Sequence, residues 1–304
     1  MHTSMRGNVA LLIAAVIWGG GFVAQSAGMD YIGPFTFSAA RDAVGFFVLL
    51  PVLLLLTDGR GRALPARLSV TRITLVGGIV NGLVLGVADT FQQVGLMMTT
   101  AGKAGFITAL YMVFTPLLGY FVGHRLTKRI AFCVLLAILG FYFLCIAEHF
   151  TLTFGDLLEL GSAVFFAVHI LTIDHYLLRQ ADSVKMAWVQ FAAAFFFSGT
   201  LTMLFEQPDA AAIWEARIPI LYCGVLSSGV AYTLQIVGQK YTDPTIGTLI
   251  MSLESVFAVL FGWLVLGELM TEREALGCVL VFAAVLLAQL PLSFLSKSSK
   301  KARR

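Results

Sequence analysis

Long apolar stretches separated by short polar segments run along the whole chain. A helix needs about 20 predominantly apolar residues to cross the hydrocarbon core of a bilayer. Ten such windows can be placed, at residues 8–28, 34–56, 73–95, 101–122, 130–147, 155–178, 185–205, 218–238, 244–266 and 275–292. The segments between them are too short to hold a soluble domain. This pattern predicts an all-α polytopic membrane protein with ten transmembrane helices.

The sequence contains an internal repeat, with one copy from Thr99 to Thr127 and a second from Thr242 to Thr271. Each copy is an apolar span that ends in a polar turn containing glycine. At a constant offset of 143 residues the matching positions are Gln92–Gly95 with Gln235–Gly238, Val113–Phe114 with Val256–Phe257, and Gly119 with Gly262. A repeat of half the chain length is typical of membrane transporters. It predicts two related halves, residues 8–147 and 155–292.

Two details of the spans bear on helix packing. Gly78, Gly82 and Gly86 lie four residues apart in the third span, and small residues at this spacing let two helix backbones approach closely in lipid. Pro116 lies inside the fourth span, where it lacks a backbone donor and should kink the helix.

Composition supports the membrane class, since 59% of the residues are hydrophobic and 12% are charged, against about 25% charged in soluble proteins. Lysine and arginine favour cytoplasmic loops. If the N-terminus is cytoplasmic, the inner segments carry Arg6, Arg60, Arg62, Arg67, Arg72, Arg125, Lys128, Arg129, Arg179, Lys185 and Lys240. The outer segments receive only Lys103, Arg217 and Arg273.

This charge bias predicts cytoplasmic N- and C-termini in the inner (plasma) membrane. Residues 293–304 are expected to form a basic cytoplasmic tail in contact with solvent or anionic lipid. Each half holds five predicted helices, which is an odd number. The two halves therefore sit in the membrane in opposite orientations, as an inverted repeat around a central cavity.

The repeated segments carry a family resemblance. The sequence LESVFAVLFGWLVLGELMT, from Leu253 to Thr271, and TTAGKAGFITALY, from Thr99 to Tyr111, resemble the EamA family of the drug/metabolite transporter superfamily. The first copy departs from the family's Gly-Glu-Arg turn, because His124 stands between Gly123 and Arg125. The resemblance covers nearly the whole chain. It implies ten helices, a cavity built mainly from helices 1–4 and 6–9, and helices 5 and 10 at the periphery.

A charge near the bilayer centre costs roughly 2.5–3.5 kcal/mol on insertion scales, so each one needs an explanation. The candidates are Arg41, Asp42, Asp89, Glu159, His169, Asp174 and Glu254. Arg41 and Asp89 lie about 10 Å and about 9 Å from the outer ends of their spans at 1.5 Å per residue. This matched depth predicts an ion pair, serving either as a structural contact or as a substrate contact at an outer gate. Glu159 and Asp174, with His175, are expected to be solvated at the ends of their helix.

Tyr111 and Glu254 are equivalent in the repeat, and each lies about ten residues into its span, near the bilayer midplane. Inverted-repeat transporters bind substrate at this depth, between the halves. Burial without a matching cation favours the neutral form of a carboxyl group. Glu254 is therefore predicted to exchange a proton for a cationic group of the substrate. The alternative is a protonated Glu254 that is hydrogen-bonded to a neighbouring helix.

Further polar and aromatic side chains within the spans are candidates for the cavity. The predicted substrate-binding set is Trp18, Arg41, Asp89, Gln92, Tyr111, His169, Gln190, Tyr232, Gln235 and Glu254, with Asn81 and Gln93 as additional candidates for its wall. Buried amides are also satisfied by hydrogen bonds between helices, without any ligand. Gln92 and Gln235 are favoured because they are equivalent in the repeat, and His169 is a candidate proton-sensitive group.

These observations predict a secondary transporter that moves a small metabolite, such as an amino acid or a related amphipathic compound, with export as the favoured direction. No Gly-x-x-x-x-Gly-Lys-[Ser/Thr], Gly-x-Ser-x-Gly or His-Glu-x-x-His motif occurs, so ATP hydrolysis by a P-loop is not expected. A flippase for lipid or polyprenyl carriers is the alternative, and an intramembrane enzyme is less favoured. The expected partners are substrate, bilayer and possible coupling protons, with no nucleic acid and no cofactor; the chain is monomeric or homodimeric.

Overall fold

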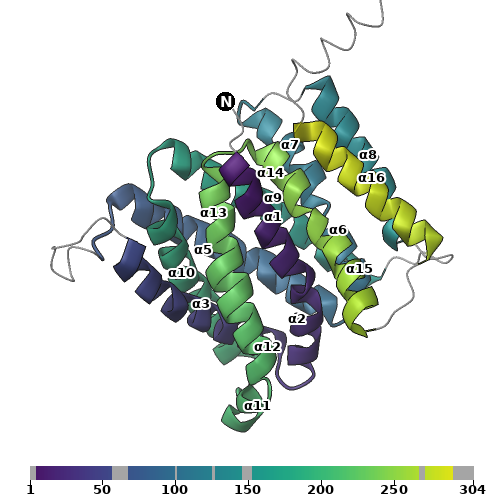
Figure 1. The fold of residues 1–304 in the computed structure, drawn as a ribbon. Helices are drawn as coiled ribbons and strands as arrows, with labels where there is room; N and C mark the ends of the chain where they lie inside the picture. Colours follow the sequence, from purple (N-terminus) through teal and green to yellow (C-terminus); the bar gives the residue numbers. More distant parts are fainter. Residues whose placement is uncertain are drawn as a thin grey trace, which may run out of the picture.

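The computed structural model describes residues 5–56, 68–99, 101–124, 127–145, 153–266 and 271–289, and all regular secondary structure within these ranges is helical (Figure 1). Seven segments of the described chain are long and apolar enough to cross a membrane: Met5–Met29, Pro34–Leu54, Arg72–Leu96, Lys103–Phe121, Phe154–Leu178, Ser183–Phe205 and Arg217–Gln239. Two shorter apolar helices cover Pro244–Ala258 and Ala275–Ala288. The all-α polytopic membrane class is thereby confirmed.

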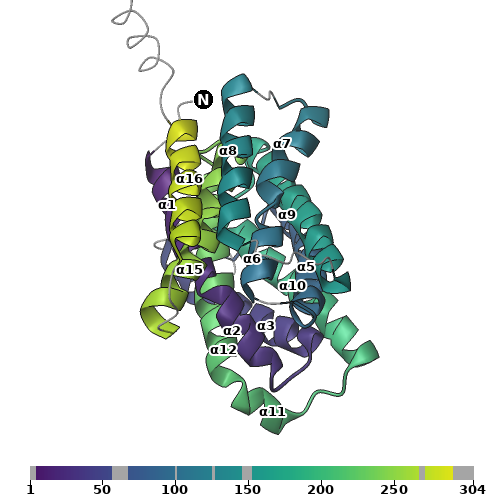
Figure 2. The same ribbon diagram turned by 90° about the vertical axis from the view of Figure 1, so that its right-hand side faces the viewer.

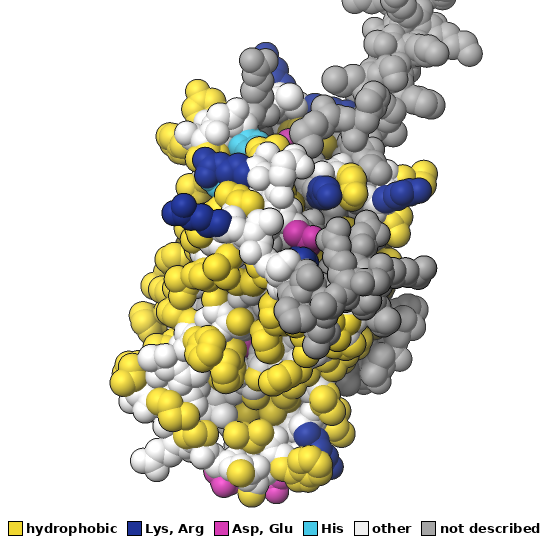
Figure 3. Space-filling model, turned by 90° about the vertical axis from the view of Figure 1, so that its left-hand side faces the viewer, with side chains coloured by type: hydrophobic (Ala, Val, Ile, Leu, Met, Phe, Trp, Pro, Cys, Tyr) yellow, Lys and Arg dark blue, Asp and Glu magenta, His cyan; other side chains and the backbone are white. Residues whose placement is uncertain are grey.

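The surface is divided into an apolar band and a basic end, as a bilayer requires. Figure 3 shows a broad band of hydrophobic side chains, and most lysine and arginine side chains on this face lie above it. That end of the molecule carries the N-terminus in Figures 1 and 2. Large apolar side chains such as Phe121, Phe196 and Met203 are 83%, 70% and 73% exposed, which suits contact with lipid rather than water. The predicted tail, residues 293–304, lies outside the described residues.

The elements of the first part of the chain are α1 (Met5–Gly19), α2 (Gly21–Met29), α3 (Pro34–Leu56), α5 (Arg72–Leu96), α6 (Ala101–Thr108), α7 (Tyr111–Phe121) and α8 (Lys128–Cys145). The second part has α9 (Phe154–Leu178), α10 (Ser183–Phe205), α11 (Ala210–Glu215), α12 (Arg217–Leu221), the π-helix η1 (Tyr222–Tyr232), α13 (Thr233–Gln239), α14 (Pro244–Met251), α15 (Leu253–Leu266) and α16 (Glu272–Gln289).

Local chemistry explains where several helices begin. Thr153 and Asp156 form a capping box at the start of α9, which satisfies backbone N–H groups that have no partner within the helix. The Asp182 side chain caps α10 by accepting a hydrogen bond from the Lys185 backbone N–H. At α14, Asp243 is the cap and Pro244 takes the first helical position, where a proline costs no hydrogen bond.

The glycine stripe of the third predicted span lies against α10. A Cβ on Gly82 would lie 2.3 Å from the Gln190 carbonyl oxygen, and one on Gly78 would lie 2.5 Å from Val189 Cβ. Close approach of the two helices therefore requires glycine at these positions, as the spacing predicted. At one side of the molecule α8 and α16 run beside each other (Figures 1 and 2), and Gly140 allows that contact because its Cβ would lie 2.8 Å from the Val281 backbone nitrogen.

Two spans are interrupted at positions that correspond in the repeat. The first breaks between α6 and α7 at Ala109 and Leu110, and the second breaks between α14 and α15 at Ser252. Ala109 and Ser252 are separated by the same 143-residue offset that aligns the two copies in the sequence. Pro116 lies inside α7, so this interruption comes before the proline, and the kink expected at Pro116 stays a prediction.

The span predicted at residues 218–238 is not a uniform α-helix. Its central part, η1, is π-helical over 11 residues. In a π-helix the backbone hydrogen bonds join residues five apart, and such segments are frequent at functional sites. Ser227 and Tyr232 are five residues apart within η1, and both face the same cavity. Tyr222 donates its hydroxyl proton to the Ile17 carbonyl of α1 at 2.8 Å, while Ser227 and Tyr232 line the cavity described below.

Candidate functional site

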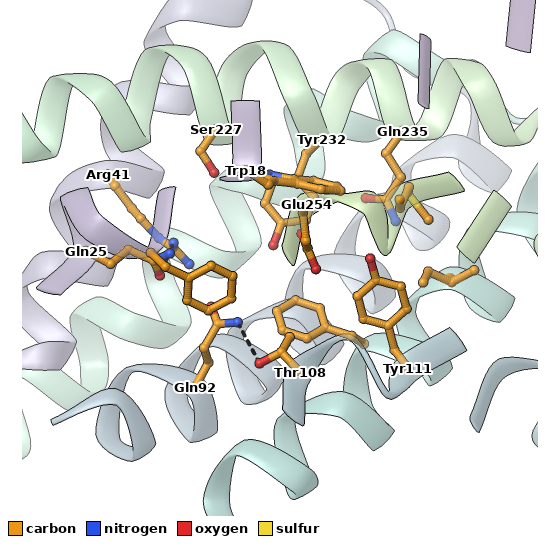
Figure 4. Close-up of a pocket in the computed structure, with 14 residues that line it drawn as sticks. Trp18, Gln25, Arg41, Gln92, Thr108, Tyr111, Ser227, Tyr232, Gln235 and Glu254 are labelled. Atoms are coloured by element: carbon orange, nitrogen blue, oxygen red, sulfur yellow. Dashed lines mark hydrogen bonds between the residues drawn. The ribbon is translucent and has the colours of Figure 1, made fainter. Parts of the chain in front are cut away.

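A cavity lies at the centre of the bundle, and the space in it that is open to the centre of a water-sized sphere is about 40 Å³. Its walls come from α1, α2, α3, α5, α6, α7, α9, η1, α13, α14 and α15, and Figure 4 shows the arrangement of the side chains. The lining residues are Trp18, Phe22, Gln25, Arg41, Gln92, Thr108, Tyr111, Phe166, Ile170, Ser227, Tyr232, Gln235, Met251 and Glu254. Neither α8 nor α16 contributes to this lining, and α10 does not either.

Seven of the ten side chains predicted to bind substrate line this cavity: Trp18, Arg41, Gln92, Tyr111, Tyr232, Gln235 and Glu254. The other three lie behind its wall. Asp89 contacts Arg41, whereas His169 and Gln190 contact each other, with His169 Nε2 and Gln190 Oε1 3.0 Å apart. The His169 ring lies edge-on to Tyr232, with ring centroids 6.0 Å apart. The structure thus places His169 where it positions the Tyr232 ring rather than in the cavity.

A buried cluster of charges forms one end of the cavity. Arg41 Nη2 lies 2.5 Å from Asp89 Oδ2, and both side chains are 2% exposed, so the predicted ion pair is confirmed. A second acid, Asp42, approaches Arg41 Nε at 3.9 Å and accepts a hydrogen bond from Ser198 at 3.3 Å. Two carboxyl groups therefore surround a single guanidinium. Gln25 Oε1 accepts a hydrogen bond from Arg41 Nη1 at 3.2 Å, which fixes the position of the guanidinium.

Glu254 points into the middle of the cavity, between Tyr111 and the paired rings of Trp18 and Tyr232 (Figure 4). Those two rings meet edge to face, with centroids 4.9 Å apart. Glu254 is 5% exposed, and its Oε1 has no hydrogen-bond partner. In the described part of the chain no basic side chain forms an ion pair with Glu254. Oε1 of this carboxyl group is therefore available to a ligand.

The two interrupted spans meet beside Glu254. The hydroxyl of Ser255, on α15, donates to the Gly105 carbonyl of α6 at 3.0 Å. Tyr111 is the first residue of α7, and Glu254 is the second of α15. Both side chains thus enter the cavity directly after a break in their helix, where backbone groups are free of the regular helical pattern.

The expected solvation of Glu159 and Asp174 at helix ends is wrong. Glu159 is 0% exposed and accepts a hydrogen bond from the Thr108 hydroxyl at 2.8 Å. Asp174 is 6% exposed, and its Oδ2 lies 3.4 Å from His124 Nε2. Helical depth counted from sequence does not reveal this, because a position near a helix end can still face another helix. The additional candidates Asn81 and Gln93 are buried and lie outside the lining.

Sequence reasoning missed several lining residues: Phe22, Gln25, Thr108, Phe166, Ile170, Ser227 and Met251. Most are apolar or small polar side chains, which look the same in a cavity wall as in a helix contact. Gln25 gave a usable signal, because an amide inside an apolar span needs a partner. Within the described residues, no group of three or more His, Cys, Asp or Glu side chains is placed to hold a metal ion.

Comparison with known proteins places this arrangement in a family. The sequence profile of the EamA-like transporter family matches residues 5–146 and again residues 153–290. The chain belongs to the EamA-like transporter family. The resemblance seen in the repeated segments is thereby confirmed.

Relatives of this EamA-like chain are found in archaea and bacteria. A protein of Archaeoglobus fulgidus named an uncharacterized transporter is 32% identical over 292 residues, which cover 93% of this chain and 85% of the relative. The uncharacterized transporter YoaV of Bacillus subtilis is 22% identical over 285 residues, covering 91% and 94%. A solved crystal structure aligns with a TM-score of 0.74 at 20% identity, over 93% of this chain and 96% of that chain, which shows a shared fold.

Proposed function

We propose that this EamA-like transporter is a secondary transporter for a small amphipathic metabolite with a cationic amino group, such as an amino acid or a related amine. The observation that carries the proposal is Glu254, a buried carboxyl group without a basic partner that faces an aromatic-walled cavity. A cationic amine supplies the missing charge. The rings of Trp18 and Tyr232 add cation–π attraction and apolar contact for the rest of the ligand.

The opposite end of the cavity suits a polar or anionic group of the same ligand. Gln25, Gln92 and Arg41 lie together there (Figure 4). The Arg41 charge is met by Asp89, so a carboxylate of the ligand competes with Asp89 for the guanidinium. An amino acid zwitterion offers charges of both signs at the two ends, which makes it the best match to this cavity.

Transport proceeds in our proposal by alternating access between two inverted five-helix halves, ten spans in all. The two separate family matches, 5–146 and 153–290, support this division of the chain. The helix breaks at Ala109 and Ser252 support it independently, since they correspond in the repeat. Glu254 holds a proton while the cavity is empty and exchanges it for the substrate amine, giving proton-coupled antiport in the direction of export.

Both termini are proposed to lie in the cytoplasm, with the protein in the inner (plasma) membrane. Single cysteines introduced in the 206–216 and 268–274 segments should react with an impermeant thiol reagent added to intact cells, because these segments are then external. Cysteines in the 57–72 segment should be protected until the cells are opened. Reaction of the 57–72 segment in intact cells would contradict the inverted repeat.

The transport proposal is tested on purified protein. A thermal-shift screen of amino acids, amines and neutral analogues should show stabilisation by amines that carry an apolar group, because a ligand that binds only the folded state raises its stability. Proteoliposomes should then accumulate that radiolabelled solute and should leave a labelled phospholipid unscrambled. Lipid scrambling without uptake of any solute would favour a flippase instead.

A further inference from the structure

The mechanism proposed above does not use Glu159, an acid on α9 that is fully buried inside the protein. The Thr108 hydroxyl donates to Glu159 Oε2 at 2.8 Å. The same hydroxyl lines the cavity and accepts a hydrogen bond from Gln92 Nε2 at 3.4 Å, drawn as the dashed line in Figure 4. A single hydroxyl group therefore separates the Glu159 carboxyl group from the cavity.

No basic side chain pairs with Glu159 in the part of the chain that the structure describes. Among the titratable groups on the helices packed against α9, Lys103 on α6 is held by Asp156, and Asp89 on α5 is held by Arg41. Tyr111 on α7 is a phenol, and α13 and α14 carry no titratable side chain. An unpaired buried carboxylate is expensive, so the folded chain accommodates Glu159 best with a proton.

Polar groups continue from Glu159 toward the end of the bundle where α6 and α9 begin. Asp156 lies one helical turn before Glu159, on the same face of α9. It accepts from Thr99 at 2.9 Å and from Lys103 Nζ at 2.5 Å, and Lys103 is 19% exposed. A Cβ on Gly95 would lie 3.0 Å from Glu159 Oε1. Glycine at this position leaves room for the acid between α5 and α9.

We propose that Glu159 is a proton-binding site of its own, connected to the cavity through Thr108 and to the α6–α9 end of the bundle through Asp156 and Lys103. Protonation forms an O–H bond at Oε1, which has no hydrogen-bond partner, while Oε2 keeps its bond from Thr108. On release the proton passes to water at that end of the bundle. Binding of a proton at Glu159 does not depend on the proposed function. Only the use of that proton in transport depends on the proposal that this chain is a transporter.

Infrared difference spectroscopy tests this site without a known substrate. The purified full-length chain in lipid vesicles is recorded in acidic and in alkaline buffer. A buried protonated carboxyl group gives a carbonyl band that disappears when the proton leaves. We expect a pH-dependent band that is absent from Glu159→Gln and present in Glu254→Gln, since the latter removes a different carboxyl group. A Glu159→Gln spectrum identical to wild type would overturn the proposal.

A second variant tests the connection to the cavity, and it also replaces the first test if Glu159→Gln does not fold. Thr108→Val removes the donor to Oε2, so the carbonyl band of Glu159 should move to higher frequency. Glu215→Gln is the control, because Glu215 is an acid exposed on α11, and its loss should leave that band in place. An unshifted band in Thr108→Val would show that Glu159 is not linked to the cavity. Failure of transport in every assay, with these bands intact, would refute the proposed function and leave the proton site standing.

Discussion

Replacement of Arg41 by glutamine is expected to lower the free energy of unfolding by about 3–5 kcal/mol, the usual cost of breaking a buried ion pair from one side. The structure gives the reason, because Asp42 and Asp89 would then remain buried without a cation. Asp89→Asn should cost less, about 1–3 kcal/mol, since Arg41 keeps Asp42 as its counter-ion. Unfolding of the purified protein by a denaturing detergent measures each value.

The double variant Arg41→Gln/Asp89→Asn separates a pair from two independent residues. If the two side chains stabilise each other, the double variant should be more stable than Arg41→Gln alone. Arg217→Gln is the control, since Arg217 is exposed on α12, and its effect should stay within about 0.5 kcal/mol. Losses that simply add in the double variant would mean that Arg41 and Asp89 act separately.

Glu254→Gln is expected to weaken binding of the cationic ligand by about 10–100-fold, because it removes a charge-assisted hydrogen bond. In the wild type, binding of a cation requires the ionised carboxylate, so affinity should rise with pH as Glu254 loses its proton. The glutamine variant should show no such rise, and a pH gradient should no longer drive uptake. Calorimetric titration at several pH values and proteoliposome uptake measure both effects.

Two comparisons keep this test specific. Glu215→Gln, at an exposed position of α11, should bind and transport like the wild type. A neutral analogue of the ligand should bind both Glu254 and its glutamine replacement with nearly equal affinity. If Glu254→Gln transports normally with an unchanged pH profile, the carboxyl group is structural and the proton-coupling role is wrong.

Those parts of the molecule that depend on hydrophobic patterning and repetition were predictable from sequence. The apolar windows led to the membrane class and the repeated segments led to the family, and both are confirmed. The Arg41–Asp89 ion pair was also predictable, because few charges lie deep in the spans and those two have opposite signs at matched depth. The assignment of the cavity residues to substrate binding remains a prediction.

The missed features depend on which side of a helix faces a neighbour. Glu159 lies near a helix end, yet it faces Thr108 across a helix contact rather than water. Ser227 escaped notice because a helical periodicity of 3.6 residues places it away from Tyr232, whereas η1 brings them to the same side. The break at Ala109 has no sequence signal of its own, since Pro116, the visible breaker, lies further along.

The π-helical stretch from Tyr222 to Tyr232 also bears on how such a cavity diverges between species. Its bonding pattern fits more residues into each turn than an α-helix does, so loss of one codon there favours return to the α form. If the lost residue lies before Ser227, the five residues from Ser227 to Tyr232 then correspond to a rotation of about 140° around the helix axis, which would turn Ser227 away from the side that it shares with Tyr232. A deletion of this kind would replace one side chain of the cavity lining by another, although no lining residue has been mutated. Ligand preference would change in that lineage without a single substitution to record it.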